Sequence, residues 1–239
     1  HGLLQGRLIK SSPAGSDNIV FFGGAGVSTE SGLPDFRSAD GLYQQPYDLP
    51  PETLLSHSYF MADPAGFFRF YRDKLLRLDV QPNPAHRTLA ALEQTGRLKA
   101  VITQNIDGLH QAAGSREVLE LHGSIHRNHC LDCGRRYDAR FVAEAPELVP
   151  RCPRCGGVIK PDVVLYEEPL DAEALSRALA HLAAADVVIV GGTSLGVYPA
   201  AGLLDAYIGD KLVVINRSST PADARANYRY FDPIGEVLG

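Results

Sequence analysis

The chain has 239 residues, with 28 acidic and 23 basic side chains, so its formal net charge is −5. Its 45% hydrophobic and 21% charged residues are ordinary for a folded globular protein and exclude a disordered, collagen-like or coiled-coil chain. The mild acidity provides no basic face for the phosphates of DNA or RNA, and no apolar run approaches the roughly 20 residues that span a bilayer. We therefore expect neither nucleic acid nor a membrane among its partners.

Apolar runs alternate along the chain with segments of helical periodicity, and this alternation predicts a doubly wound α/β fold with a parallel sheet. Helices are predicted over 3–10, 64–78, 84–95 and 171–184. Strands are predicted over 19–22, 100–103, 118–121, 187–190 and 212–215. The last two are continuous apolar runs, which are typical of strands buried on both faces. A proline-rich stretch between residues 34 and 51 predicts a long ordered loop.

The first strand runs into Gly24-Ala25-Gly26, as a phosphate-binding turn should. Glycines there let backbone N–H groups approach a pyrophosphate, with help from the following helix N-terminus. The full dinucleotide fingerprint is absent, because Thr29 stands where a third glycine would be. A glycine turn that only permits close strand–helix packing therefore remains an alternative.

Polar residues follow the later strands in the same way. Gly191-Gly192-Thr193-Ser194 ends one strand and Asn216-Arg217-Ser218 follows the next. Because the carboxyl ends of parallel strands meet at one edge of a sheet, these groups are predicted to converge with the glycine turn in one ligand crevice.

Thr103-Gln104-Asn105-Ile106-Asp107 follows another strand, and His122 follows the strand after it. Asn105 and Asp107 offer an amide and a carboxylate close to the same crevice. The alternative is that Asn105 and Asp107 cap a helix and that His122 is a buried histidine with satisfied hydrogen bonds.

The segment 123–160 breaks the strand–helix rhythm and contains all four cysteines of the chain, as two CxxC pairs: Cys130, Cys133, Cys152 and Cys155. Two such pairs, 18 residues apart, favour one structural zinc ion with four thiolate ligands and no open position. A thioredoxin-like dithiol is the competing interpretation, and His126 or His129 replacing one cysteine is a minor one. Reduced cysteines of this kind predict a cytoplasmic protein.

Several motifs together resemble those of the sirtuins, the NAD-dependent protein lysine deacylases, and in particular the bacterial type. They occur in the family's order along nearly the whole chain: Gly24–Ser28, Ser31–Arg37, Thr103–Asp107, Leu121–Gly123, the paired CxxC and Gly192–Ser194. The resemblance implies a Rossmann-like NAD-binding domain over 1–39, 81–122 and 161–239. It also implies a small lobe that combines a helical part over 40–80 with a zinc-ribbon insert over 123–160.

The resemblance also implies roles for individual residues. The catalytic residues would be His122, Asn105 and Asp107, with His122 as general base for a ribose hydroxyl. The NAD-binding residues would be Gly24, Ala25, Gly26, Asp35, Phe36, Arg37, Gln104, Asn105, Ile106, Asp107, Gly192, Thr193, Ser194, Asn216 and Arg217. An acetylated protein substrate would bind as an extended peptide, added as a strand to Val163, Val164, Leu165 and Tyr166. NAD would be consumed, giving nicotinamide and O-acetyl-ADP-ribose.

Three departures from the family pattern bear on specificity. Gly23 replaces the usual threonine of the first turn, which keeps the turn itself. Glu167 replaces the usual glycine of the substrate loop, where it would either attract basic peptides or be merely solvated. Relatives that remove succinyl or malonyl groups carry Tyr-x-x-Arg, whereas this chain has Tyr71 and Lys74, which favours acetyl. Desuccinylation or demalonylation, and protein mono-ADP-ribosylation, remain the alternatives.

Overall fold

The computed structural model describes residues 18–35, 47–196 and 200–238. The predicted helix over 3–10 and two predicted NAD-binding residues, Phe36 and Arg37, lie outside them. The large domain is a six-stranded sheet in the order β3 (Val118–Glu120), β2 (Leu98–Thr103), β1 (Ile19–Gly23), β7 (Val187–Gly191), β8 (Leu212–Ile215), β9 (Tyr228–Tyr230). All neighbouring strands are parallel. The predicted doubly wound α/β fold is confirmed, and its strand order is that of a Rossmann sheet.

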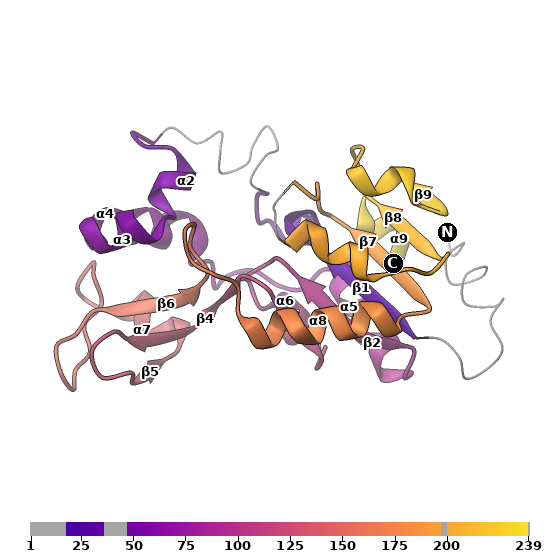
Figure 1. Ribbon diagram of the computed structural model, residues 1–239. Helices are drawn as coiled ribbons and strands as arrows, with labels where there is room; N and C mark the ends of the chain where they lie inside the picture. Colours follow the sequence, from indigo (N-terminus) through magenta and orange to yellow (C-terminus); the bar gives the residue numbers. More distant parts are fainter. Residues whose placement is uncertain (1–17, 36–46, 197–199, 239) are drawn as a thin grey trace.

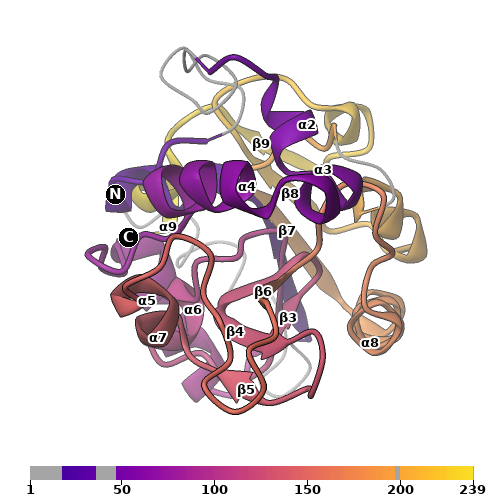
Figure 2. The ribbon, with the colours of Figure 1, turned by 90° about the vertical axis from the view of Figure 1, so that its left-hand side faces the viewer.

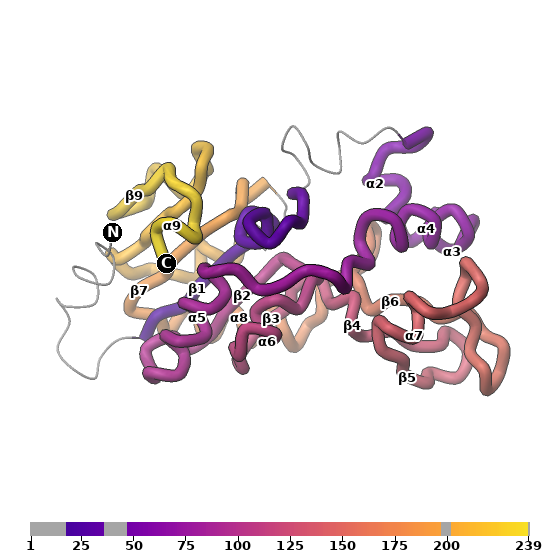
Figure 3. The backbone as a smooth tube through the Cα atoms, turned by 180° about the vertical axis from the view of Figure 1, so that it is seen from behind, coloured from indigo at the N-terminus to yellow at the C-terminus, as the bar shows by residue number. Residues whose placement is uncertain are grey.

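Alternate side chains of each central strand pack on opposite faces of this sheet. Val20 and Phe22 of β1 face α8 (Ala172–Ala184) and the 3₁₀ segment η5 (Ala200–Ala206). Ile19 and Phe21 face α5 (Pro84–Gln94) and α9 (Ile234–Leu238) on the other side. Figure 1 shows α8 in front of the sheet, and Figure 3 shows α5 and the short α6 (Leu109–Ala112) from behind. Burial on both faces explains the continuous apolar runs in the sequence.

The ends of the main helices follow local signals. Asn83 caps α5 through hydrogen bonds from the N–H groups of Ala85 and His86, and the His86 ring accepts in return from the Asn83 N–H. Asp171 caps α8 by accepting from the N–H of Ala174. Two short 3₁₀ turns, η1 (Ala25–Val27) and η2 (Thr29–Ser31), stand where the sequence suggests a helix after β1.

The small lobe lies to one side of the large domain in Figure 1, faces the viewer in Figure 2, and has its own sheet. This sheet is antiparallel, in the order β5 (Arg136–Tyr137), β4 (Gly123–Cys130), β6 (Ile159–Val163), with α7 (Ala139–Glu144) against β4. Over it lie α2 (Pro51–Leu54), α3 (His57–Ala62) and α4 (Pro64–Phe70). The aromatic rings of Phe60, Phe67, Phe68 and Tyr71 pack edge to face or stacked between these helices and the sheet.

Two predicted elements differ from the observed ones. The helix predicted over 64–78 ends as α4 at Phe70 and continues only as one wider turn, η4 (Tyr71–Leu75), which the Leu76 N–H closes on the Tyr71 carbonyl. The boundary predicted at residue 160 falls inside β6, whose pairing with β4 runs on to Val163. Strand pairing across the lobe was invisible in the sequence because the segment lacks long apolar runs. The last element to be named is the 3₁₀ turn η6 (Pro221–Ala224), which lies between β8 and β9 in the chain. Among the described residues, no helix has the length and apolar character required to cross a membrane.

Candidate active site

The carboxyl ends of the central strands lie level with one another. Gly23 of β1 is paired with Thr103 of β2 and Gly191 of β7, and Gly191 is paired with Ile215 of β8. The segments that follow these strands line a cavity of about 380 Å³ at the switch point between β1 and β7. Eleven predicted site residues line it: Ala25, Gly26, Asp35, Gln104, Asn105, His122, Gly192, Thr193, Ser194, Asn216 and Arg217.

The glycines of the first turn are required for close packing. A Cβ on Gly26 would lie 2.7 Å from the Gly192 Cα, and a Cβ on Gly24 would lie 2.8 Å from the Gln104 side chain. The Gly26 N–H donates to the Gly192 carbonyl at 2.8 Å, so this N–H joins two strand ends instead of pointing at a phosphate. The sequence left phosphate binding and close packing as alternatives, and for Gly26 the contacts are those of packing.

Gln104, which follows β2, and Thr193, which follows β7, are hydrogen-bonded to each other in the cavity wall. The Thr193 hydroxyl donates to Gln104 Oε1 at 2.8 Å. Gln104 Nε2 is buried and has no hydrogen-bond partner among the described residues. An unpartnered buried donor in the wall of a cavity is a position where a polar ligand restores a lost hydrogen bond.

A small hydrogen-bonded group lies behind Asn105, which lines the cavity. The Ser28 hydroxyl donates to Asp107 Oδ2 at 2.6 Å, and Asn105 Nδ2 donates to Ser28 Oγ at 3.3 Å and to the Gly24 carbonyl at 2.9 Å. Asp107 Oδ1 also accepts from the Leu109 N–H at the start of α6. Asp107 thus accepts from the first N–H of α6, whose N-cap residue is Gly108, and is joined to Asn105 through Ser28. Ser28 was quoted in a motif but given no role from the sequence.

Two buried histidines lie beneath this group. The His86 ring nitrogen Nε2 lies 3.4 Å from Ser28 Oγ, and the ring packs edge to face on His110. Burial lowers the pKa of His86 to about 4, against the opposing effect of Asp107. Burial also lowers the pKa of His110 to about 3, and neither of its ring nitrogens has a partner in the described part of the chain. Both rings are therefore neutral at ordinary pH.

His122 sits in the cavity wall with one ring nitrogen engaged. Its Nδ1 lies 3.0 Å from the Gln104 carbonyl, which accepts only from a protonated nitrogen. In the neutral ring the proton is thus on Nδ1, and Nε2 keeps its lone pair. Burial lowers the pKa of His122, although the Gln104 carbonyl opposes the shift. A neutral imidazole whose Nε2 has no hydrogen-bond partner among the described residues is suited to accept a proton near neutral pH.

The sequence did not single out several residues of this cavity wall. They are Thr29, Glu30, Ile215, Asp232, Pro233 and Ile234, whereas Ser218, predicted with Asn216 and Arg217, does line the cavity. Glu30 Oε1 accepts from the Gly235 N–H and so fixes the start of α9. Asp232, Pro233 and Ile234 follow β9, which is too short and polar to be recognised as a strand. Gly24, Ile106 and Asp107 were predicted for the site but are not among the lining residues of the cavity.

The segment predicted to pair with a peptide is partly engaged within the protein. The Tyr166 N–H donates to the Leu55 carbonyl, and the Tyr166 carbonyl accepts from the His57 N–H. The Leu165 N–H donates to Glu168 Oε1, and the Val164 N–H donates to the His122 carbonyl. Both backbone groups of Tyr166 are used within the small lobe, and the Leu165 carbonyl accepts from the Glu168 N–H.

The two predicted acyl-chain residues differ in their surroundings. Tyr71 is fully buried among phenylalanines, its hydroxyl has no partner among the described residues, and this burial raises its pKa. Lys74 Nζ lies 3.7 Å from Asp73 Oδ2 and 5.9 Å from the centre of the Tyr47 ring. The ammonium group is therefore paired beside Tyr47 and Asp73.

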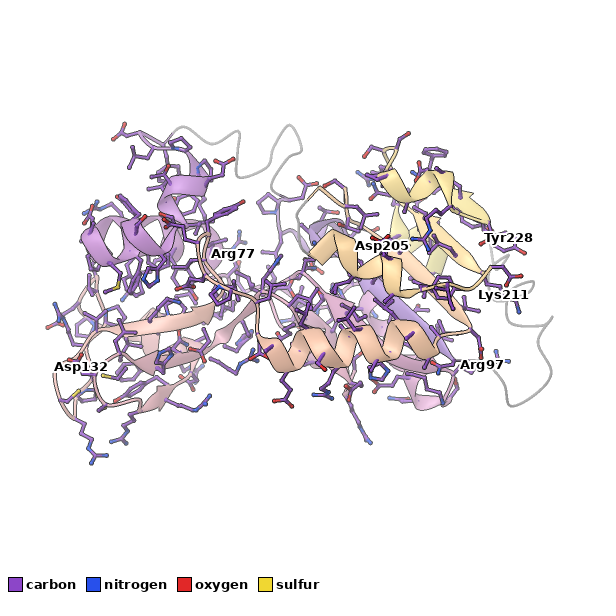
Figure 4. All side chains as sticks on the ribbon, in the orientation of Figure 1. Arg77, Arg97, Asp132, Asp205, Lys211 and Tyr228 are labelled. Atoms are coloured by element: carbon purple, nitrogen blue, oxygen red, sulfur yellow. The ribbon has the colours of Figure 1, made fainter. Side chains whose placement is uncertain are left out.

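The four cysteines meet at the far end of the small lobe, where Asp132 marks the tip in Figure 4. Cys130 Sγ lies 3.4 Å from Cys155 Sγ, Cys133 Sγ lies 3.7 Å from Cys152 Sγ, and all four sulfurs lie within 4.8 Å of one another. A tetrahedron of Zn–S bonds near 2.3 Å separates its sulfurs by about 3.8 Å. The cluster therefore fits one zinc ion.

The two cysteine pairs adopt the same turn. Gly134 has φ +73° and its N–H donates to the Cys130 carbonyl; Gly156 has φ +76° and its N–H donates to the Cys152 carbonyl. The left-handed backbone at each glycine lets the turn close behind its two thiolates. This repeated turn, without a disulfide, favours the metal site predicted from the spacing.

Comparison with known proteins gives a consistent result. The model of the Sir2 family matches residues 24–199. An NAD-dependent protein deacetylase of Clostridium perfringens is 57% identical over 94% of this chain and 93% of its own length. A protein of the same description from Clostridium acetobutylicum is 53% identical, over 96% of this chain and 95% of its own length.

Solved structures agree with the sequence matches. A Sir2 variant with a deacetylated p53 peptide and 3′-O-acetyl ADP-ribose superposes with a TM-score of 0.86 at 38% identity, covering 92% of this chain and 90% of that one. A complex of Sir2 with a p53 peptide and NAD+ gives a TM-score of 0.83 at 39% identity, with the same coverage. From the family match, the identities and the shared architecture, the chain belongs to the Sir2 family.

Proposed function

We propose that this protein is an NAD-dependent protein lysine deacetylase, which transfers the acetyl group of acetyl-lysine to ADP-ribose and releases nicotinamide and O-acetyl-ADP-ribose. The observation that carries the proposal is the free Nε2 of neutral His122 in the wall of a cavity at the sheet's switch point. Relatives more than 50% identical over almost the whole chain are described as NAD-dependent protein deacetylases.

The donors and acceptors of the cavity are those that NAD requires. Thr193, Ser194, Asn216 and Arg217 follow β7 and β8 and would contact the adenosine half and the phosphates. The buried Nε2 of Gln104 is an unused donor beside them. Asn105 and Asp107, with Ile106 between them, would hold the nicotinamide amide at the inner end. Ala25, Gly26 and Asp35 line the opening between these ends; Gly24, Phe36 and Arg37 are assigned to NAD from the family pattern alone.

NAD supplies the ADP-ribosyl group, whose anomeric carbon accepts the acyl oxygen as nicotinamide leaves. The chain's part is to orient the groups and to move one proton. His122 Nε2 accepts the proton of a ribose hydroxyl, and the Gln104 carbonyl, bonded to Nδ1–H, holds the ring in the required tautomer and stabilises the cation that forms. Ser28 orients the Asp107 carboxylate by donating to Oδ2.

The substrate is proposed to be an acetylated protein, bound as an extended peptide along Val163, Val164 and Leu165 with Tyr166 at the end of the segment. Complexes of Sir2 enzymes with peptides support a peptide substrate. Zinc, held by the four cysteines, would stabilise the lobe that carries this segment and has no open position for chemistry. Because those thiols must be reduced, we place the protein in the cytoplasm.

Acetyl is proposed as the acyl group because Lys74 stands where relatives that remove succinyl or malonyl groups carry an arginine. Lys74 lies against Asp73, which screens its charge, and a lysine lacks the bidentate fork of an arginine. Tyr71 offers one hydroxyl in otherwise apolar surroundings. Removal of succinyl or malonyl groups is the less favoured alternative, and a succinyl-peptide processed faster than the matched acetyl-peptide would replace our choice.

The test is to incubate the protein with NAD and an acetyl-lysine peptide and to detect O-acetyl-ADP-ribose by mass spectrometry. We expect this product and nicotinamide in equal amounts, and a loss of about 100- to 10,000-fold in the rate of product formation in His122→Ala. The matched control is His181→Ala, which removes a histidine of α8 that does not line the cavity. Transfer of labelled ADP-ribose to protein without acyl-lysine, with no O-acetyl-ADP-ribose, would instead identify a mono-ADP-ribosyltransferase.

A further inference from the structure

Glu167, directly after the proposed peptide-binding segment, has an unusual backbone. Its φ is +77°, in the left-handed region where glycine is favoured and a side chain is disfavoured. A residue other than glycine stays in such a conformation when its surroundings hold it there. We therefore expect the glutamate side chain to make a contact that holds the backbone in this conformation.

That contact is with the first turn of α3. Glu167 Oε1 accepts hydrogen bonds from the Ser58 N–H at 2.9 Å and from the Ser58 hydroxyl at 2.8 Å, and Oε2 lies 3.1 Å from the same hydroxyl. The bond from the Ser58 N–H is the main cause that lowers the pKa of Glu167, so the carboxylate is charged at neutral pH. The carboxylate is exposed but engaged, so it is neither a free charge for basic peptides nor merely solvated.

Neighbouring contacts join the same two segments. Tyr166 pairs in parallel with Ser56 through its bonds to Leu55 and His57, and Glu168 Oε2 lies 2.8 Å from His57 Nδ1. Glu168 Oε1 in turn lies 3.4 Å from the nearly buried ammonium of Lys160 on β6. The end of the peptide-binding segment is thus joined to α3 by backbone bonds and by two adjacent carboxylates.

We propose that Glu167 is a positioning residue for the peptide substrate: its carboxylate fastens the end of segment 163–166 to Ser58 of α3 and so presets the backbone edge on which the peptide pairs. The inference rests on the proposed deacetylase function. An edge held in its bound shape loses less conformational freedom when the peptide arrives, so the contact lowers the KM for peptide. NAD binds at the other strand ends, and its KM does not depend on Glu167.

Three substitutions separate this role from its alternatives. Glu167→Ala removes the carboxylate, and Glu167→Gly removes it while permitting the left-handed backbone. Glu167→Gln removes the charge but keeps an oxygen that accepts from both Ser58 donors. Glu52→Ala, which removes a carboxylate from an exposed position on α2 of the same lobe, is the matched control.

Steady-state kinetics with an acetyl-lysine peptide measures the outcome. We expect the Ala and Gly variants to raise the KM for peptide by roughly 3- to 10-fold, with kcat and the KM for NAD within about 2-fold of the parent protein. Glu167→Gln and Glu52→Ala should resemble the parent. If Gln behaves like Ala, attraction of a charged peptide replaces the proposal; if Ala is impaired but Gly is not, backbone strain replaces it.

Amide hydrogen exchange tests the contact without any turnover. In Glu167→Ala, the Ser58 and Tyr166 amides should exchange faster, while the amides of β7 and β8 should be unchanged. Unchanged exchange at Ser58 and Tyr166 would overturn the positioning role even in an active enzyme. A parent protein that forms no O-acetyl-ADP-ribose would overturn the proposed function but would leave this exchange result as measured.

Discussion

The six-stranded sheet of the large domain is packed on both faces, whereas the three-stranded sheet of the small lobe is covered by an aromatic cluster and meets four cysteines at its far end. In the large domain, residues such as Val188 and Ile189 alternate between two separate apolar cores. In the small lobe a single core contains both Phe67 and the buried Cys130. Figure 4 places Asp132 at one end of the molecule and Arg97 near the other.

The difference shows how stability and function are divided. The large sheet has enough apolar surface to hold its strand ends level without a metal, and the nucleotide cavity depends on that level edge. The small sheet has three strands and packs on a single apolar core, so we expect its order to depend on zinc and on a few rings. Since β6 leads directly into the proposed peptide segment, loss of the lobe would abolish substrate binding before it disturbs the nucleotide cavity.

Metal removal is the change with the largest expected effect on this comparison. Chelation, or Cys155→Ser, should unfold β4, β5, β6 and α7, because structural zinc contributes on the order of 10 kcal/mol to the folding of small metal-bound units. Deacetylation should be lost, while amides of β1 and β7 remain protected in hydrogen exchange measured by mass spectrometry.

Arg154→Ser is the matched control for metal loss, because Arg154 is an exposed neighbour within the same turn. It should retain one zinc per chain and full protection of the small lobe. If chelation left β4 and β6 protected, the lobe would be shown to fold on its apolar core alone, and the contrast with the large domain would disappear.

A substitution that creates a cavity in the aromatic cluster of the small lobe should have the next largest effect on stability. Phe67 is fully buried, with its ring 4.9 Å from that of Phe60 and 5.5 Å from that of Tyr71. Phe67→Ala should lower the free energy of unfolding of the small lobe by about 3–5 kcal/mol, as measured by urea unfolding. Tyr71→Phe, which removes a buried hydroxyl without a partner, should be neutral or stabilising. Equal losses in both variants would contradict a stabilising role for ring packing.

The sequence predicted the large domain well for a physical reason. Strands such as Val187–Gly191 are buried on both faces, so their side chains carry a continuous apolar signal, and their polar successors identify the ligand edge. The cysteine spacing was similarly informative because a metal fixes the geometry of its ligands. The family resemblance then implied the NAD chemistry that spacing alone did not.

The sequence was less informative where contacts between distant parts of the chain determine the local structure. β9 is defined by its pairing with β8, and the wall residues Asp232 and Pro233 come directly after it. No periodicity in the sequence predicts this pairing. α4 ends at Phe70 and passes into the wider turn Tyr71–Leu75, and the run of β6 past residue 160 depends on its pairing with β4. The contact of Glu167 with Ser58 joins residues 109 positions apart, so only the three-dimensional structure shows it.

Lowering the pH should destabilise the large domain through the buried histidines beneath its cavity. We expect this to be the smallest of the three effects on stability. The pKa of His110 is lowered to about 3 by burial, against an ordinary value of 6.5 in the unfolded chain. Between these values the unfolded state binds more protons, so the stability that is present above pH 6.5 falls as the pH is lowered.

His110→Leu removes the titrating group and leaves no new polar atom without a partner. Relative to the parent, we expect it to gain on the order of 2 kcal/mol in unfolding free energy between pH 7.5 and pH 5, measured by urea unfolding of the zinc-loaded protein. Because zinc loss at low pH affects both proteins alike, an identical pH dependence in the two would show that His110 does not make the large domain acid-sensitive.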